Sequence, residues 1–234
     1  MFFVLGLVTL LFTAYQVWGR PGEITREQAE LSRQLDQQWQ APVSKLTSPY
    51  PAQPSSVPLV PGVAGPAAPL VSARPSPRPE APLTGRVFAR LTLPRLGMTW
   101  TVAEGTDEAV LRNGLGHYSE TQMPGIRGNF AVAGHRQRGL LWDLDQTRRG
   151  DAIVVETLHR WFVYRIDYIE TVPPSDIGVL APVPDHPGMT PGGASIVLQT
   201  CTPKWSDRYR LIVVGRLESE MDKTVGQPAA LVGR

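Results

Sequence analysis

A lone cysteine is the residue in this chain with the greatest capacity for covalent chemistry. Cys201 ends the run 195–201, whose β-branched and apolar residues predict a strand, and Thr202-Pro203 follows it directly. Because proline interrupts the hydrogen-bonded ladder of a strand, the thiol is expected at the mouth of the strand. Unpaired cysteines are commonly inert core residues, whereas strand ends and loops are where proteins display reactive groups. The position therefore favours Cys201 as a nucleophile.

Arg210 opens the next apolar run, residues 210–214. If the two runs form a hairpin with residues 202–209 as its loop, Arg210 lies directly opposite Cys201, with Cβ atoms about 5 Å apart on one face. A guanidinium there would stabilise a thiolate and an acyl oxyanion. A slip of one residue would turn Arg210 to the other face, and Arg208 is then the alternative. A solvated strand-edge charge is the structural alternative.

His135 is the third candidate, because an apolar run at 129–134 leads straight into it and a polar loop follows. Imidazole titrates near neutrality, which suits an acid–base partner for a thiol. A histidine at a strand end is otherwise an ordinary surface residue. Of the other histidines, His159 and His186 fall in expected turns or loops. His117 lies on a loop before the His135 run and is expected to line a substrate groove.

Composition excludes several classes of protein and site. The chain of 234 residues carries 23 Lys+Arg against 21 Asp+Glu, a net charge of +2 that argues against nucleic-acid binding. One cysteine excludes an internal disulfide and any multi-cysteine metal centre, and four dispersed histidines make structural zinc improbable. Asp143 and Asp145 alone are weak support for calcium. No glycine-rich phosphate loop is present.

The elements that must position these residues are short strands within residues 86–218. Valine-, isoleucine- and aromatic-rich runs bounded by turn residues predict them, with short helical turns at 107–113 and 176–180. Many short strands with long polar connections favour a closed or nearly closed β-barrel. The predicted strands are 87–93, 99–103, 129–134, 152–156, 161–172, 195–201 and 209–217.

The chain outside this domain divides into four segments. Residues 1–19 carry no charge and would span about 28 Å as a helix, which predicts an uncleaved membrane anchor. The alternative, a cleaved signal peptide, needs a small-x-small cleavage site that this run matches poorly. Residues 20–40 predict a polar juxtamembrane helix with a weak apolar stripe. Residues 41–85 hold 12 prolines in 45 positions, which predicts a disordered linker reaching up to about 140 Å. Residues 219–234 are expected to form a polar tail.

Taken together, the three candidate segments resemble the His, Cys and Arg segments of sortases, the cell-wall transpeptidases of Gram-positive bacteria. The family's cysteine motif is Thr-Leu-x-Thr-Cys, and here Val197 occupies its first position while Leu198, Thr200 and Cys201 match. The resemblance covers essentially all of residues 86–218, and the anchor and spacer agree with sortase layout. The segments of the three candidates are 133–136, 198–201 and 210–215, and those similar to the class E branch of actinobacteria are 114–121, 124–136 and 202–205.

This resemblance implies an all-β, eight-stranded sortase barrel and a cysteine transpeptidase without a cofactor. Cys201 would attack the Thr–Gly carbonyl of a sorting signal and form a thioester, His135 would move the proton, and Arg210 would hold the substrate and the oxyanion. Candidate substrate-binding residues are Tyr118, His117 and Thr200, with Tyr118 assigned to the class E preference for Leu-Ala-x-Thr-Gly over Leu-Pro-x-Thr-Gly.

The implied partners are surface proteins with a C-terminal sorting signal and a peptidoglycan precursor amine as acceptor. The implied location is the cell membrane, with a single pass through residues 1–19 and an extracellular catalytic domain.

Two other functions remain open from the sequence. An L,D-transpeptidase also uses Cys, His and Arg, but it would carry a histidine just before the cysteine, and here His135 lies far upstream. A membrane-tethered β-barrel binding module without activity is the second alternative, because geometry and not residue identity decides catalysis.

Overall fold

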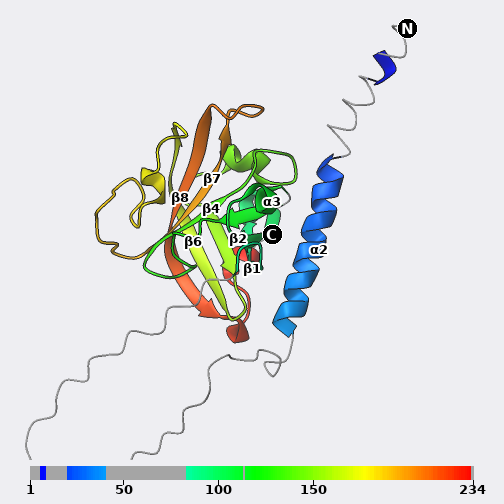
Figure 1. The fold of residues 1–234 in the computed structure, drawn as a ribbon. Coiled ribbons are helices and arrows are strands. Elements are labelled where there is room, and N and C mark those ends of the chain that lie inside the picture. The colour runs from blue at the N-terminus through cyan, green and yellow to red at the C-terminus, as the bar shows by residue number, and fades with distance from the viewer. Residues whose placement is uncertain (1–5, 9–19, 41–82, 113, 233–234) are drawn as a thin grey trace, which may run out of the picture.

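Eight strands close into one barrel in the computed structural model, which describes residues 6–8, 20–40, 83–112 and 114–232 (Figure 1). The strands are β1 (Val87–Leu93), β2 (Met98–Glu104), β3 (Leu115–His117), β4 (Gly128–Ala133), β5 (Ala152–Glu156), β6 (Arg160–Val172), β7 (Ala194–Thr202) and β8 (Tyr209–Asp222). The helices and helical turns are α2 (Arg20–Gln40), η3 (Pro94–Leu96), α3 (Glu108–Leu111), η4 (Leu141–Gln146), η5 (Gly178–Leu180), η6 (Lys223–Val225) and α4 (Ala229–Val232).

The order of strands around the barrel is β1-β2-β3-β4-β7-β8-β6-β5. The pairs β2–β3 and β4–β7 are parallel, and the other neighbours are antiparallel. The predicted all-β, eight-stranded barrel is therefore confirmed. Seven strands lie where the sequence predicts them, whereas β3 was missed, because three residues are too short a run to show an apolar period.

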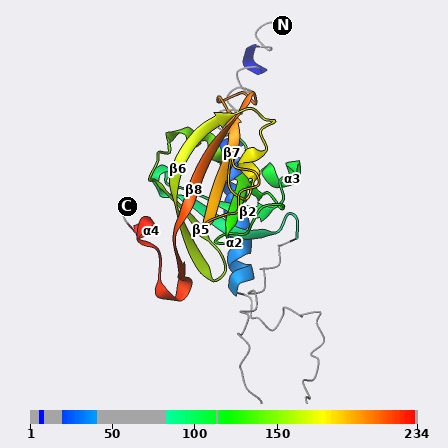
Figure 2. The ribbon, with the colours of Figure 1, turned by 90° about the vertical axis from the view of Figure 1, so that its left-hand side faces the viewer.

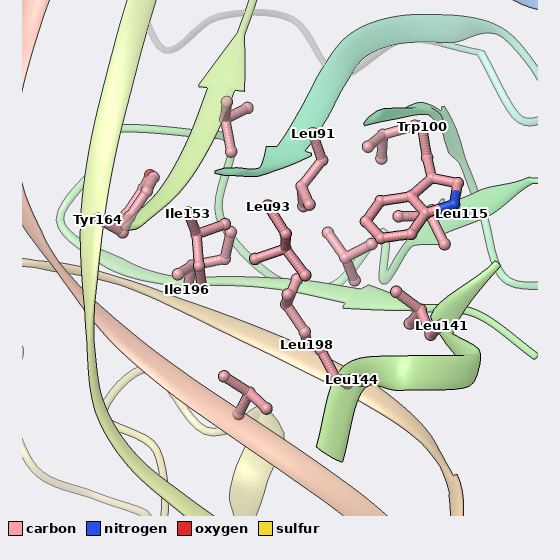
Figure 3. Close-up of a cluster of buried hydrophobic side chains, with 14 of the residues drawn as sticks. Leu91, Leu93, Trp100, Leu115, Leu141, Leu144, Ile153, Tyr164, Ile196 and Leu198 are labelled. Atoms are coloured by element: carbon pink, nitrogen blue, oxygen red, sulfur yellow. The ribbon is translucent and has the colours of Figure 1, made fainter. Parts of the chain in front are cut away.

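Alternation along β7 and β8 sorts their side chains into two layers. The inner side chains join a buried cluster that draws on strands all around the barrel (Figure 3). The outer side chains form a second cluster with Val172 and Val179, under the loop 173–193. This parity decides which face Cys201 occupies. The inner residues of the hairpin are Ile196, Leu198, Leu211 and Val213, and the outer ones are Val197, Ile212 and Val214.

The helix expected at 20–40 is present as α2, but it packs against the barrel on the side of β1 and β2 (Figure 1). Its apolar stripe buries Ile24 and Leu35. Gln28 Oε1 accepts hydrogen bonds from the backbone nitrogen of Thr101 at 2.8 Å and from its Oγ1 at 3.1 Å. From the barrel, Arg90 donates to the Ser32 side chain and backbone carbonyl at 2.9 Å each. Helix α2 is therefore part of the folded domain.

Replacing Gln28 by alanine is expected to lower the free energy of unfolding by about 1–3 kcal/mol, because the buried amide of Thr101 loses its acceptor. Urea unfolding of the full chain measures the effect. Gln34→Ala is the matched control, since Gln34 is exposed on the same helix and bonds with Glu30, one turn away. Equal stability of the two variants would contradict the docking of α2 through Gln28.

The predicted anchor and linker fall mostly outside the described residues. Of the anchor, only residues 6–8 are described, and of the linker only 83–85. Among the helices that the structure does describe, none combines the length and the apolar character required to span a membrane.

The C-terminal segment is built into the barrel rather than forming a tail (Figure 2). Strand β8 continues to Asp222, which pairs with Arg160 of β6. Beyond it, Ala230 and Leu231 pack on a cluster that includes Trp161 of β6. Residues 219–222, expected in the polar tail, are therefore part of strand β8, because polar residues that are exposed can still pair along a strand.

Candidate active site

Cys201 and Arg210 lie directly opposite each other in the β7–β8 hairpin. The predicted register is therefore confirmed. Because Val197 and Ile212 have the same parity, both side chains belong to the outer face of the barrel, beside the loop 173–193. Arg208 lies in the connecting loop, exposed, with its guanidinium 5.3 Å from the centroid of the Tyr209 ring. The structure therefore assigns the position opposite the thiol to Arg210.

The Arg210 guanidinium is fixed by the loop that it closes. Its Nη1 donates to the carbonyl of Asp207 at 2.8 Å and to that of Tyr209 at 3.3 Å. Two carbonyls on one nitrogen hold the planar group at the mouth of the hairpin. The side chain is thus preorganised as a fork of donors.

His135 comes to the same end of the barrel because β4 and β7 are parallel neighbours. Ala133 pairs with Gln199, and the Gly134 amide donates to the Gln199 carbonyl at 3.1 Å. A side chain at Gly134 would bring a Cβ within 2.5 Å of Leu115 Cδ2, so glycine allows this close approach. The His135 side chain is 38% exposed, and its Nε2 lies 3.8 Å from Glu108 Oε2 on α3. The three predicted catalytic residues are therefore gathered at one edge.

Tyr118 also belongs to this site. Its hydroxyl accepts a hydrogen bond from Gln199 Nε2 at 2.8 Å, and Gln199 has the same parity as Cys201. Burial raises the pKa of Tyr118, while the charge of Arg210 lowers it and that of Cys201 raises it. Tyr118 is thus within electrostatic reach of both. Gln199 was missed from the sequence, although its place two residues before Cys201 on the same strand face could have indicated it.

His117 does not line a groove, so that prediction is wrong. Its side chain is 1% exposed, with Nδ1 2.8 Å from Glu104 Oε2 and Nε2 3.0 Å from Thr121 Oγ1. The ring also lies 5.0 Å from that of Phe130, centroid to centroid. His117 is the last residue of β3, the strand missed from the sequence. It is a satisfied internal histidine that joins β2, β3 and the turn that follows.

Thr200 is likewise placed away from the groove, and its prediction as a substrate-binding side chain is wrong. The residue is 2% exposed and pairs with Leu211, a member of the inner cluster. Successive residues of a strand point to opposite faces. Thr200 therefore faces the barrel interior because its neighbour Cys201 faces out.

Metal binding finds little support near the site. Asp143 and Asp145 contact Lys204 Nζ, at 3.1 and 3.6 Å. Across the described part of the chain, no three His, Cys, Asp or Glu side chains are arranged to hold a metal ion.

A group of acidic side chains joins the loop 173–193 to β6. The hydroxyl of Tyr168 donates to Asp185 Oδ2 across this junction. Burial raises the pKa of Glu170 to about 7, and a hydrogen bond with Asp185 and the negative charges of Asp185 and Asp176 act in the same direction. Glu170 therefore carries a proton over much of the acid range when the chain is folded.

This proton makes the stability of the fold depend on pH. Between pH 4.5 and about 7 the folded chain retains a proton that the unfolded chain releases. The free energy of unfolding therefore falls as pH rises through that window. Glu170→Gln is expected to remove this part of the fall, as measured by urea unfolding at pH 5 and pH 8. The control Glu218→Gln, exposed and paired with Arg165, should keep it. An unchanged pH dependence in Glu170→Gln would refute the assignment.

Comparison with known proteins gives a consistent result. The sortase domain family matches residues 91–218. Sortase E1 of Streptomyces coelicolor is 32% identical over 242 residues, which cover 99% of this chain and 59% of that protein. The chain thus spans less than two thirds of this relative's length.

Solved sortase structures share the fold. Sortase E from Streptomyces avermitilis is 40% identical and matches 64% of this chain and 99% of that one, with a TM-score of 0.58. The SrtF sortase from Corynebacterium diphtheriae is 32% identical and matches 68% of this chain and 98% of that one, with a TM-score of 0.62. With its barrel, its outward-facing Cys201 opposite Arg210, and these matches, the chain belongs to the sortase family, and its resemblance to the class E branch is confirmed.

Proposed function

We propose that this protein is a cysteine transpeptidase that cleaves a C-terminal sorting signal between Thr and Gly and transfers the new C-terminus to an amine. The observation that carries the proposal is the pairing of Cys201 with Arg210 at the edge to which β4 delivers His135. A nucleophile, a proton carrier and a fork of cationic donors are the groups that acyl transfer requires.

The first half of the reaction forms a thioester. The Cys201 sulfur attacks the carbonyl carbon of the Thr–Gly bond, and the oxyanion that develops accepts hydrogen bonds from the Arg210 guanidinium. When the C–N bond breaks, the glycine amine leaves with a proton supplied by His135.

The second half transfers the acyl group. An incoming amine attacks the thioester carbonyl and gives its proton to His135. The C–S bond breaks, the thiolate returns, and a new amide joins the substrate to the acceptor. Each step balances without an oxidant or a cofactor.

The proposed substrates are surface proteins with a signal of the Leu-Ala-x-Thr-Gly or Leu-Pro-x-Thr-Gly type, and the proposed acceptor is a peptidoglycan precursor amine. Tyr118 and Gln199 support a peptide site beside the thiol, since they form a polar pair on its face of the hairpin. We further propose that residues 1–19 anchor the chain in the cell membrane, with the barrel outside the cell.

The test uses the full chain with a Leu-Ala-x-Thr-Gly peptide and triglycine, and with the Leu-Pro counterpart in parallel. Mass spectrometry should find the peptide, cleaved after Thr, as an acyl group on Cys201. It should also find a ligated product in which triglycine replaces the residues that followed Thr in the substrate. Absence of adduct and product with both peptides would contradict the proposal and favour a binding module without activity.

A further inference from the structure

The side chain that follows His135 is buried and makes contacts on both sides of the site. The Arg136 side chain is 3% exposed. Its Nε donates to the carbonyl of Trp142 at 2.7 Å, its Nη1 donates to the carbonyl of Cys201 at 3.3 Å, and its Nη2 lies 2.9 Å from Asp145 Oδ2. All three guanidinium nitrogens are therefore engaged, one of them with the backbone of the nucleophile.

The contact of the Arg136 side chain with the Cys201 carbonyl extends the hydrogen-bond ladder between β4 and β7 beyond the last backbone bond. The Gly134 amide donates to the carbonyl of Gln199 at 3.1 Å. In a parallel ladder the next rung would join the backbone of residue 136 to the carbonyl of residue 201. At that rung the guanidinium of Arg136 takes the carbonyl. The two neighbours of His135 are thereby both bonded to the end of β7, Gly134 through its backbone amide and Arg136 through its side chain.

A second connection ties the loop after Cys201 to the same helical turn, η4. Lys204 Nζ lies 3.1 Å from Asp143 Oδ1, and the rings of Trp142 and Trp205 meet edge to face with centroids 4.9 Å apart. Because Arg136 also bonds to η4 through Trp142 and Asp145, it stands where the two loops that flank the site are joined.

Burying a guanidinium costs free energy unless every donor finds a partner. The Asp145 side chain, the only carboxylate partner of Arg136 among the described residues, is itself 46% exposed. The ion pair therefore adds little to the free energy of unfolding. At 3% exposure Arg136 cannot meet a substrate directly. Its contacts instead fix where the backbones of His135 and Cys201 stand relative to each other.

We propose that Arg136 is a positioning residue, which holds His135 in register with Cys201 for proton transfer. This inference rests on the proposed transpeptidase function. A displacement of about 1 Å between reacting groups can cost about 100-fold in rate. Loss of Arg136 should therefore act on the chemical steps and leave peptide binding nearly unchanged.

The test compares Arg136→Met and Arg136→Lys with the wild-type full chain. For Arg136→Met we expect kcat for peptide cleavage to fall about 100-fold, with KM changed less than about threefold. We also expect the pH profile of Cys201 alkylation by iodoacetamide to shift from that of the wild type, because the thiol loses its aligned imidazole. Arg136→Lys should recover only part of the wild-type kcat and of the wild-type alkylation profile, since an ammonium cannot reach three acceptors in a plane.

The matched control is Arg138→Met, two residues further along the same loop. Arg138 is exposed, and its guanidinium lies 5.4 Å from the centroid of the Trp142 ring. It should keep the wild-type kcat and alkylation profile. If Arg136→Met does not fold, Asp145→Asn tests the same idea, because it leaves Arg136 in place but removes its charge partner. A lower kcat with a shifted alkylation profile is expected there too.

Two failures can be told apart. If folded Arg136 and Asp145 variants lose thermal stability but keep the wild-type kcat and alkylation profile, Arg136 is merely structural and the inference is overturned. If the wild-type chain itself cleaves neither peptide, the proposed function fails. Alkylation profiles that still differ between wild type and Arg136→Met would in that case support the positioning role alone.

Discussion

Cys201→Ala is expected to abolish peptide transfer, with a loss of about 10⁴-fold or more. The chain contains no second thiol that could form a thioester. The fold should persist, because Cys201 is only partly buried and lies at a strand end. Product formation by mass spectrometry measures the loss, and circular dichroism checks the fold.

A control for this variant is Ser206→Ala in the loop that follows, which removes a hydroxyl similar in size to the thiol of Cys201. It should retain transfer activity. Continued ligation by Cys201→Ala, with the same product mass, would end the proposal that the reaction runs through a thioester.

Arg210→Lys is expected to lower kcat by about 100- to 1,000-fold, the usual cost of removing one oxyanion donor. Lysine keeps the charge, but its ammonium cannot keep the bonds to the Asp207 and Tyr209 carbonyls and present a second donor to the oxyanion. Steady-state kinetics with the sorting peptide measures the effect, and the yield of acyl adduct shows whether the first half-reaction is slowed.

Arg208→Lys is the matched control, since Arg208 lies in the same loop and is stacked against Tyr209. Its kcat should remain within about threefold of the wild type, because the side chain is exposed and lysine keeps its charge. If Arg208→Lys were the crippling change and Arg210→Lys harmless, the oxyanion role would belong to Arg208 despite the register of the hairpin.

The hairpin and its two candidate catalytic residues were predictable because they depend on local signals. The apolar runs, the proline after Cys201 and the length of the loop together fix which residues are opposite. The helical turn η5 and the capped turn α3 also lie where turn residues predicted them. In each case the residues that determine the local structure are close to one another in the sequence.

Thr200 could have been assigned from the sequence, since it precedes Cys201 on the same strand and alternation turns the two side chains to opposite faces. His117 could not be assigned, because its strand β3 is too short to be recognised and its partner strands meet it only when the barrel closes. The same limit applies to Gln28, whose partner Thr101 is distant in the chain. The sequence places Arg136 in a polar loop, since no neighbouring residue indicates that its side chain bonds to the Cys201 carbonyl.

The docking of α2 changes how far the barrel can range from residue 20. The chain rejoins the barrel after the proline-rich segment at Gly85, whose amide donates to the Glu104 carbonyl at 2.7 Å. With α2 already bonded to β1 and β2, the length of residues 41–82 adds nothing to that distance. The 21-residue helix extends only about 31 Å.

For an anchor at residues 1–19, as proposed above, helix α2 would then limit the distance from residue 20 to the barrel to about 31 Å, whereas a fully extended linker would add up to about 140 Å. A membrane-held acceptor would therefore remain closer to Cys201, which would raise its effective concentration there. If the contact between α2 and the barrel opened, the linker would again lengthen the distance from residue 20 that Cys201 can cover.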